Sequence, residues 1–283
     1  MPQDNSEPTD FSLEQFDLIK TIGRGKRNIK RIIFSQTDFS ILGAFGQVCL
    51  SRHQNSKIFY AMKILSLKHI IKMKQIEHVR NEKKILKFID HPFLINLTWS
   101  HIDSSYLYLL LPFIPGGELF SYLRSVGNFS LSTTLFYSAE IVSALDYLHS
   151  ISVAYRDLKP ENILLDKDGH VVLTDFGFSK EIPERSWTMC GTPDYMAPEI
   201  FLNLGHDCSV DWWSLGVLVY DMLIGCPPFS EGVLDVYDSI MLGKVRWPKN
   251  MDCIAKDFIQ KLLVQDSYKR LGSTSSEDVK NHK

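Results

Sequence analysis

Tyr155-Arg156-Asp157-Leu158-Lys159-Pro160-Glu161-Asn162 is the stretch that decides the fold, and Asp175-Phe176-Gly177 follows it closely. An acid, an amide five positions later and a second acid in a nearby turn are the groups that a site for two Mg²⁺ ions and a substrate hydroxyl requires. Asp157 is suited to accept the hydroxyl proton, and Asn162 and Asp175 supply the hard oxygen ligands that Mg²⁺ prefers. A lone Arg-Asp-Leu would be an ordinary loop salt bridge, but the full set predicts a catalytic loop.

The composition is that of an ordinary globular protein. The chain has 283 residues, of which 45% are hydrophobic and 23% charged, and its net charge is −2. This charge gives no general attraction to nucleic acid or anionic membranes. No apolar run of about 18 residues is present, which predicts no transmembrane segment. Five scattered cysteines without metal-ligand spacing predict reduced thiols and a cytoplasmic location.

The first half of the chain predicts a small sheet with one helix. Aromatic and β-branched composition predicts strands at residues 16–22, 48–51, 59–65 and 106–113. Residues 72–88 carry Ile76, Val79, Lys83 and Leu86 at a 3–4 spacing, with charges on the other face. This pattern predicts one continuous helix.

The second half is predicted to be mainly helical. Pro115-Gly116-Gly117 ends the last strand and predicts a hinge at residues 112–117. Helices are predicted at residues 119–126, 132–150 and 211–224, and a hairpin joins residues 163–165 to 171–174. The fold class is therefore α+β, with a flexible tail (1–15), a small β-rich lobe with one key helix (16–111), the hinge, and a larger helical lobe (118–283).

Lys63 stands near the end of a predicted strand and would be a fixed positive charge for phosphate oxygens. An isolated strand lysine is usually a solvated surface residue, so a functional Lys63 needs an acidic partner on the following helix. Glu82 is the better candidate for this partner, and Glu77 is the alternative.

Together these motifs resemble the eukaryotic protein kinases, in particular the cAMP-dependent protein kinases and their close relatives in the AGC group of serine/threonine kinases. The resemblance runs from about Phe16 to the last residue, with one interruption. It rests on residues 60–63, 75–78, 81–83, 115–118, 155–162, 174–178, 187–193, 197–199 and 210–213. It implies the bilobal kinase fold, ATP and Mg²⁺ as cofactors, and transfer of the ATP γ-phosphate to protein Ser or Thr.

The resemblance also assigns roles to individual residues. Asp157 would be the catalytic base, Lys159 would contact the γ-phosphate, and Lys63 with Glu82 would hold the other phosphates. Asn162 and Asp175 would bind Mg²⁺, Leu111 would be the gatekeeper, and Ile114 would donate its N–H to adenine. The remaining ATP contacts would be Gly23, Gly25, Gly46, Val48, Ala61, Glu118 and Leu164. Glu199 and Arg270 would form a structural ion pair.

Regulation and substrate choice follow from the same resemblance. Thr188 would be the activating phosphorylation site, held by Arg156, Lys180 and His78. Thr192 is typical of the serine/threonine type. The acidic residues Glu118, Glu161 and Asp221 match positions that receive substrate arginines, which predicts Arg-Arg-x-Ser/Thr-hydrophobic substrates. A cAMP-binding regulatory subunit is an implied partner: Trp187 and Arg124 match its contacts, but Leu204 replaces a lysine.

The glycine-rich loop departs from the family pattern. Gly23-Arg24-Gly25 is separated from Ala44-Phe45-Gly46-Gln47-Val48 by residues 26–43. We expect these residues to be a retained intron, because Gly25-Lys26 and Ile41-Leu42-Gly43 permit donor-like and acceptor-like codons and their removal restores the motif. A nuclear-localisation patch at residues 26–31 is the alternative. We also expect the family's C-terminal tail to be absent, and a non-catalytic binding protein is the alternative function.

Overall fold

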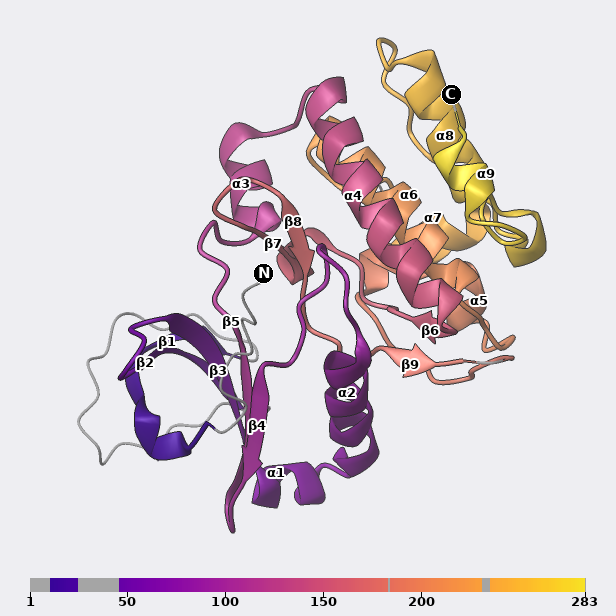
Figure 1. The fold of residues 1–283 in the computed structure, drawn as a ribbon. Coiled ribbons are helices and arrows are strands. Elements are labelled where there is room, and N and C mark those ends of the chain that lie inside the picture. The colour runs from indigo at the N-terminus through magenta and orange to yellow at the C-terminus, as the bar shows by residue number, and fades with distance from the viewer. Residues whose placement is uncertain (1–10, 25–45, 183, 231–234, 283) are drawn as a thin grey trace, which may run out of the picture. The chain divides into compact units, whose positions relative to one another are not determined.

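The computed structural model describes residues 11–24, 46–182, 184–230 and 235–282 (Figure 1). The chain divides into two compact units, one formed by Met1–Phe88 with Ile95–Ile114 and the other by Ile89–Leu94 with Pro115–Lys283. They correspond to the predicted small β-rich lobe and larger helical lobe. Gly25 and the predicted insertion at residues 26–43 lie outside the described residues. No helix in the described ranges is long and apolar enough to span a bilayer.

The first unit is built on a five-stranded antiparallel sheet. Its strands are β1 (Phe16–Arg24), β2 (Gln47–His53), β3 (Phe59–Ser66), β4 (Trp99–Ile102) and β5 (Tyr106–Pro112), in the order β1-β2-β3-β5-β4. The four predicted strands are confirmed to within a few residues at their ends, and β4 was not predicted. Buried and less buried side chains alternate along much of β3, so Met62 and Ile64 are fully buried in the core beside Leu110.

The predicted helix at residues 72–88 is wrong in its first part. The structure has two helices, α1 (Leu67–Lys72) and α2 (Ile76–Phe88). Lys74 adopts a left-handed backbone conformation with φ of 54°, which ends helical geometry between them. Glu82, Ile85 and Leu86 are the buried residues of α2, so only one face of this helix enters the core.

The second unit is mainly helical. It contains α3 (Leu119–Val126), α4 (Leu131–Ser150), α5 (Pro198–Phe201), α6 (Ser209–Ile224), α7 (Val236–Leu242), α8 (Cys253–Leu262) and α9 (Glu277–Lys280). The Ser130 hydroxyl caps α4 by accepting the Thr133 N–H at 3.1 Å. The α6 helix confirms the helix predicted at residues 211–224, and it is buried from Ser209 through Met222.

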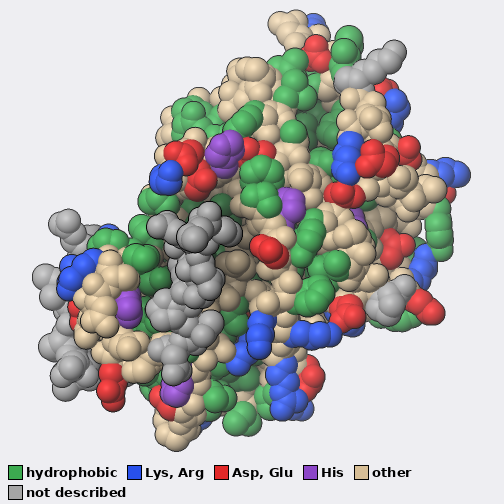
Figure 2. Space-filling view, viewed as in Figure 1, with side chains coloured by type: hydrophobic (Ala, Val, Ile, Leu, Met, Phe, Trp, Pro, Cys, Tyr) green, Lys and Arg blue, Asp and Glu red, His purple; other side chains and the backbone are tan. Residues whose placement is uncertain are grey.

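Short strands and turns carry the loops of the second unit. The predicted hairpin is formed by β7 (Ile163–Leu165) and β8 (Val171–Leu173), and β6 (Val153–Ala154) pairs with β9 (Lys180–Glu181). Short 3₁₀ turns occur at Leu13–Gln15 in the first unit and at Pro160–Asn162, Pro193–Tyr195 and Ser267–Lys269 in the second. Hydrophobic, acidic and basic side chains are all spread over the visible face (Figure 2).

The unit boundary differs from the predicted lobe of residues 16–111 in one segment. Ile89–Leu94 belongs to the second unit. The Leu173 N–H donates to the Phe93 carbonyl at 2.9 Å, and Leu94 forms an isolated parallel β-bridge with Leu173. The division near the hinge falls between Ile114 and Pro115, inside the predicted range 112–117.

Candidate active site

In the first unit, the structure pairs Lys63 with Glu82. The Lys63 ammonium on β3 lies 2.5 Å from a carboxylate oxygen of Glu82 on α2, and Glu82 is only 4% exposed. Glu77, the alternative partner, is exposed and instead pairs with Arg80 at 2.9 Å. Burial of the acid gives Lys63 a fixed position, which suits a cation that must meet phosphate oxygens.

Four other first-unit residues assigned to ATP lie on the same sheet, namely Gly23, Val48, Ala61 and Leu111. Val48 is opposite Lys63 and Gly23, and Ala61 is opposite Leu111. Gly46 has φ of 109°, and a Cβ there would lie 2.5 Å from the Ile64 carbonyl oxygen, so this position requires glycine. Ile114 follows β5 and is the last residue of this unit.

In the second unit, the Asp157 carboxylate is surrounded by hydrogen-bond donors. One oxygen accepts from the Lys159 ammonium and the Asn162 amide, each at 2.7 Å, and the other accepts from the Thr192 hydroxyl at 3.0 Å. Lys159 also donates to the Thr192 hydroxyl at 2.7 Å. Asp157 is 4% exposed. The four residues form one network that fixes the carboxylate of the predicted base.

Asp211 at the start of α6 holds the backbone of this loop. Its carboxylate accepts the N–H groups of Tyr155 at 2.9 Å and Arg156 at 2.7 Å, and His149 lies 2.8 Å away. Arg156 has φ of 67°, a conformation that non-glycine residues rarely adopt. No role was predicted for Asp211, although an acid in the first turn of an otherwise apolar helix is a signal that the sequence contains.

The residues assigned to Mg²⁺ have suitable chemistry. Asn162 gives its amide N–H to Asp157, so the amide oxygen is the atom suited to a cation. The backbone carbonyl of Asn162 accepts the Thr174 N–H at 2.8 Å. This bond fixes the backbone next to the exposed Asp175 relative to Asn162. No group of three or more His, Cys, Asp or Glu side chains suited to a metal occurs among the described residues. A small number of protein ligands is typical of Mg²⁺ sites in which substrate phosphates supply further ligands.

Two of the three groups assigned to the Thr188 phosphate lie near Thr188 in the second unit. The Ser186 hydroxyl lies 3.4 Å from an Arg156 guanidinium nitrogen, 3.2 Å from the Lys180 ammonium and 3.5 Å from the Thr188 N–H. His78, the third group, is on α2 in the first unit, where its ring lies 2.6 Å from Gln75. The cluster of Arg156, Lys180 and Ser186 thus places two cations beside the segment that carries Thr188.

The three acids assigned to substrate arginines have different environments. Glu118 and Glu161 are exposed on the surface. Glu118 is nevertheless partly covered, and this partial burial, together with the charge of Glu161, raises the pKa of Glu118. Asp221 is fully buried: it forms a two-point ion pair with Arg124 at 2.8 and 2.9 Å, and it accepts the Tyr195 hydroxyl at 2.6 Å. Asp221 is therefore not open to a substrate arginine in this conformation, contrary to the sequence-based assignment.

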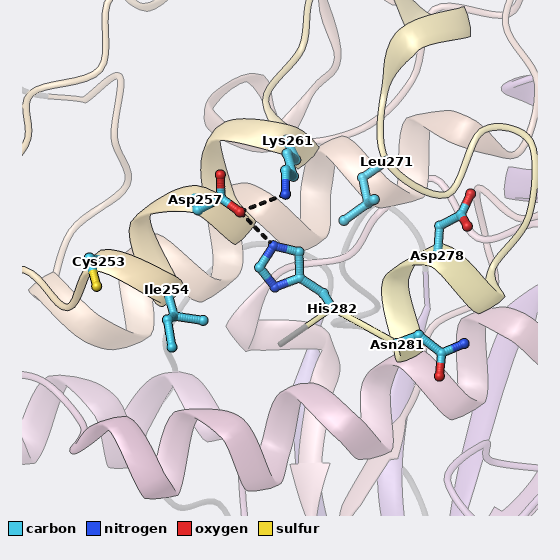
Figure 3. A pocket seen from close by; sticks show the side chains of 8 residues that line it. All are labelled: Cys253, Ile254, Asp257, Lys261, Leu271, Asp278, Asn281 and His282. Atoms are coloured by element: carbon cyan, nitrogen blue, oxygen red, sulfur yellow. Dashed lines mark hydrogen bonds and ion pairs between the residues drawn. The ribbon is translucent and has the colours of Figure 1, made fainter.

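The second unit has three further features. Arg270 is fully buried and forms the predicted ion pair with Glu199, in which two contacts measure 2.7 and 2.9 Å. Leu164 on β7, one of the residues assigned to ATP, forms an isolated antiparallel bridge with Glu118. A pocket of about 600 Å³ lies between α8 and α9, lined by Asp257, Lys261, His282 and neighbouring side chains (Figure 3). It contains none of the predicted site residues.

The chain matches the protein kinase domain family over residues 42–283. It belongs to this family. It is 50% identical over 276 residues to the cAMP-dependent protein kinase catalytic subunit 3 of Drosophila melanogaster. The matched region covers 96% of the chain and 44% of the fly protein. It is 48% identical over 280 residues to the cAMP-dependent protein kinase catalytic subunit PRKX of Homo sapiens, with 98% of the chain and 73% of that protein covered.

A third relative names the reaction class directly. The chain is 52% identical over 211 residues to the putative serine/threonine-protein kinase PRKY of Homo sapiens, covering 74% of the chain and 76% of that protein. The chain thus carries a serine/threonine protein kinase domain that uses ATP, which supports the catalytic interpretation over a non-catalytic binding protein. It spans less than half of the fly relative and about three quarters of the two human ones.

Proposed function

We propose that Asp157 is the base that accepts the proton of a substrate Ser or Thr hydroxyl while Lys63 and Lys159 bind ATP phosphates. The observation that carries this proposal is the network around Asp157, because its carboxylate is held by Lys159, Asn162 and Thr192. A fixed base and fixed cations lower the barrier to phosphoryl transfer by positioning and electrostatics. Mg²⁺, held by Asn162 and Asp175, would neutralise phosphate charge.

The preferred substrates are basic peptides of the form Arg-Arg-x-Ser/Thr-hydrophobic. Glu118 and Glu161 support this proposal, because both side chains are exposed, neither carboxylate forms a hydrogen bond or ion pair with a described residue, and the two charges repel each other. A guanidinium placed beside both would remove this repulsion and form charge-assisted hydrogen bonds. Asp221 would act indirectly, by holding Arg124 and Tyr195 in place.

Phosphorylation of Thr188 would switch the enzyme on. A phosphate there adds a charge of about −1.5 to −2 and three acceptor oxygens. Arg156 is adjacent to Asp157 in sequence and Lys180 lies near Ser186, so a phosphate bound to both would stabilise the catalytic loop against the activation segment. The chain would also bind a cAMP-binding regulatory subunit through the exposed Trp187 and through Arg124, while Leu204, which is also exposed, stands where the family has a lysine.

The decisive experiment measures transfer of γ-phosphate from labelled ATP to two peptides that differ only in Arg-Arg or Ala-Ala before x-Ser-hydrophobic. We expect activity toward the first peptide, abolished in Asp157→Ala, and a selective rise in KM for it in Glu118→Gln/Glu161→Gln. Asp168→Asn, a change in an exposed turn of the same unit, is the control and should behave as wild type. Equal use of both peptides would reject the substrate proposal but not the kinase activity.

The same assay on chains with and without residues 26–43 tests the interrupted glycine loop. We expect the shortened chain to be the more active one, because its glycines can form a continuous turn over the phosphates. Sequencing the transcript tests the intron hypothesis separately, since a single uninterrupted exon would reject it.

A further inference from the structure

His206 is a buried residue beside the Thr188 phosphate cluster, and the proposed function gives it no role. It follows a turn in which Asn203 and Gly205 both have positive φ, 51° and 73°. Its backbone pairs with that of Ser186 through two hydrogen bonds of 2.8 Å, one in each direction. The side chain is 3% exposed. Its position is thus fixed by the activation segment itself.

The imidazole contacts Arg156. Its Nε2 atom lies 3.2 Å from a terminal nitrogen of the guanidinium. Arginine has donors only, so Nε2 must accept, and the ring is the neutral form with its proton on Nδ1. Burial and the charge of Arg156 lower the pKa of His206 to about 4, against the opposing charges of Glu199, Asp211 and Asp207. The ring is therefore a neutral acceptor near neutral pH.

Three acceptors together determine how the Arg156 guanidinium is turned. The Phe178 carbonyl accepts from Nε at 2.7 Å, while His206 and Ser186 share one terminal nitrogen, at 3.2 and 3.4 Å. The contact with Ser186 is long, so Phe178 and His206 provide the two shorter contacts. They hold the guanidinium at Nε and at one terminal nitrogen, whose N–H groups point in different directions, and the other terminal nitrogen has no hydrogen-bond partner among the described residues.

We propose that His206 is a positioning residue that, as a neutral hydrogen-bond acceptor, holds Arg156 in the orientation that binds a phosphate on Thr188. This proposal rests on the proposed Thr188 switch. Without the acceptor, the guanidinium would have to be ordered when the phosphate arrives, and the entropy lost then would weaken the charge-assisted contact. Because Arg156 adjoins Asp157, this weakening would lower catalytic activity.

The test uses the full chain with phosphothreonine incorporated at residue 188, as wild type, His206→Gln and His206→Leu. Glutamine keeps an acceptor, whereas leucine does not. We measure kcat and the rate at which an added phosphatase removes the phosphate. His206→Leu should lower kcat and speed phosphate removal, each about tenfold, the loss corresponding to one hydrogen bond to a charged group. His206→Gln should stay within about twofold of wild type. His170→Gln is the control for replacing a histidine.

The same His206 changes are made in Thr188→Ala, where no phosphate can bind. A positioning role predicts no further loss of kcat there, and melting temperatures check that each variant is folded. The proposal is overturned if His206→Leu protects the phosphate as well as wild type does, if it lowers kcat equally in Thr188→Ala, or if glutamine is as harmful as leucine. If phosphorylated and Thr188→Ala chains have equal kcat, the Thr188 switch fails, and phosphatase protection still decides the role of His206.

Discussion

Asp211 accepts the backbone N–H of Arg156 at 2.7 Å, and it does so where Arg156 has φ of 67°. A left-handed backbone at a non-glycine residue costs on the order of 1–3 kcal/mol. The buried carboxylate offsets this cost by binding two consecutive N–H groups and His149. The conformation of the catalytic loop thus depends on a residue more than 50 positions away in the sequence.

We therefore predict that Asp211→Asn destabilises the protein and impairs the loop. The amide replaces one carboxylate oxygen by a donor that faces another N–H, so the free energy of unfolding should fall by about 2–4 kcal/mol. Urea unfolding and kcat at saturating substrates measure the two effects. Asp257→Asn, which alters an exposed ion pair with Lys261, is the control and should cost less than about 1 kcal/mol.

Breaking the Lys63–Glu82 ion pair should lower the activity more than the stability. In Glu82→Gln the lysine keeps a hydrogen-bond partner but loses the opposite charge, so its position before ATP binds is less fixed. We expect kcat/KM for ATP to fall by about 10- to 100-fold, in line with a lost charge-assisted contact of about 1.5–3 kcal/mol. Glu77→Gln on the same helix should change it less than about twofold. Equal effects of the two substitutions would contradict the assigned role of Glu82.

The buried Arg270–Glu199 pair predicts that lysine cannot replace arginine. Arg270→Lys keeps the charge but loses the two-point contact and the bond from Arg270 to the Ser209 carbonyl at 2.9 Å. The free energy of unfolding should fall by about 3 kcal/mol, measured by urea unfolding. Lys269→Ala, at the neighbouring exposed position, should leave it nearly unchanged.

The lowered pKa of His206 predicts a specific pH dependence of stability. Between the unfolded value of 6.5 and the folded value of about 4, the unfolded chain binds a proton that the folded chain does not. Stability therefore falls as the pH drops through this window, by about 2 kcal/mol between pH 7 and pH 5 for this group. Unfolding experiments at pH 7 and pH 5 measure this loss of stability. In His206→Gln the part that comes from His206 should be absent.

His170 provides a control of opposite sign. The hydrogen bond with Glu140, together with its charge, raises the pKa of His170, so the stability that His170 contributes is present below pH 6.5 and is lost as the pH rises through the folded value. His170→Gln should therefore steepen the loss of stability toward acid pH. An unchanged slope in His206→Gln would show that His206 is not buried as a neutral ring.

Local signals predicted most of the elements. The α3 and α4 helices were placed to within a residue, because Gly127 marks the end of α3 and Ser130 the start of α4 in the sequence. The break between α1 and α2 was missed, since apolar spacing continues across it and the left-handed conformation of Lys74 has no sequence signature. The short β4 strand was missed because its side chains are not buried.

The candidate site could be predicted only as far as its motifs reach. Asp157, Asn162 and Asp175 lie in short, recognisable stretches. The burial of Asp221 could not be predicted, because it depends on Arg124, nearly a hundred residues earlier in the chain. The same holds for His206, whose contact with Arg156 arises only when residues 50 positions apart meet.

The network around Asp157 has a consequence for wasteful ATP hydrolysis. Both carboxylate oxygens already accept hydrogen bonds, and one of these comes from the Thr192 hydroxyl. A carboxylate has about four acceptor positions, so these three bonds leave one, on the oxygen that accepts from Thr192. A free water must be ordered at that single position before Asp157 can take its proton, whereas a protein substrate brings its hydroxyl there already held by its other residues. The network would thus favour hydroxyls that arrive on a bound substrate over solvent.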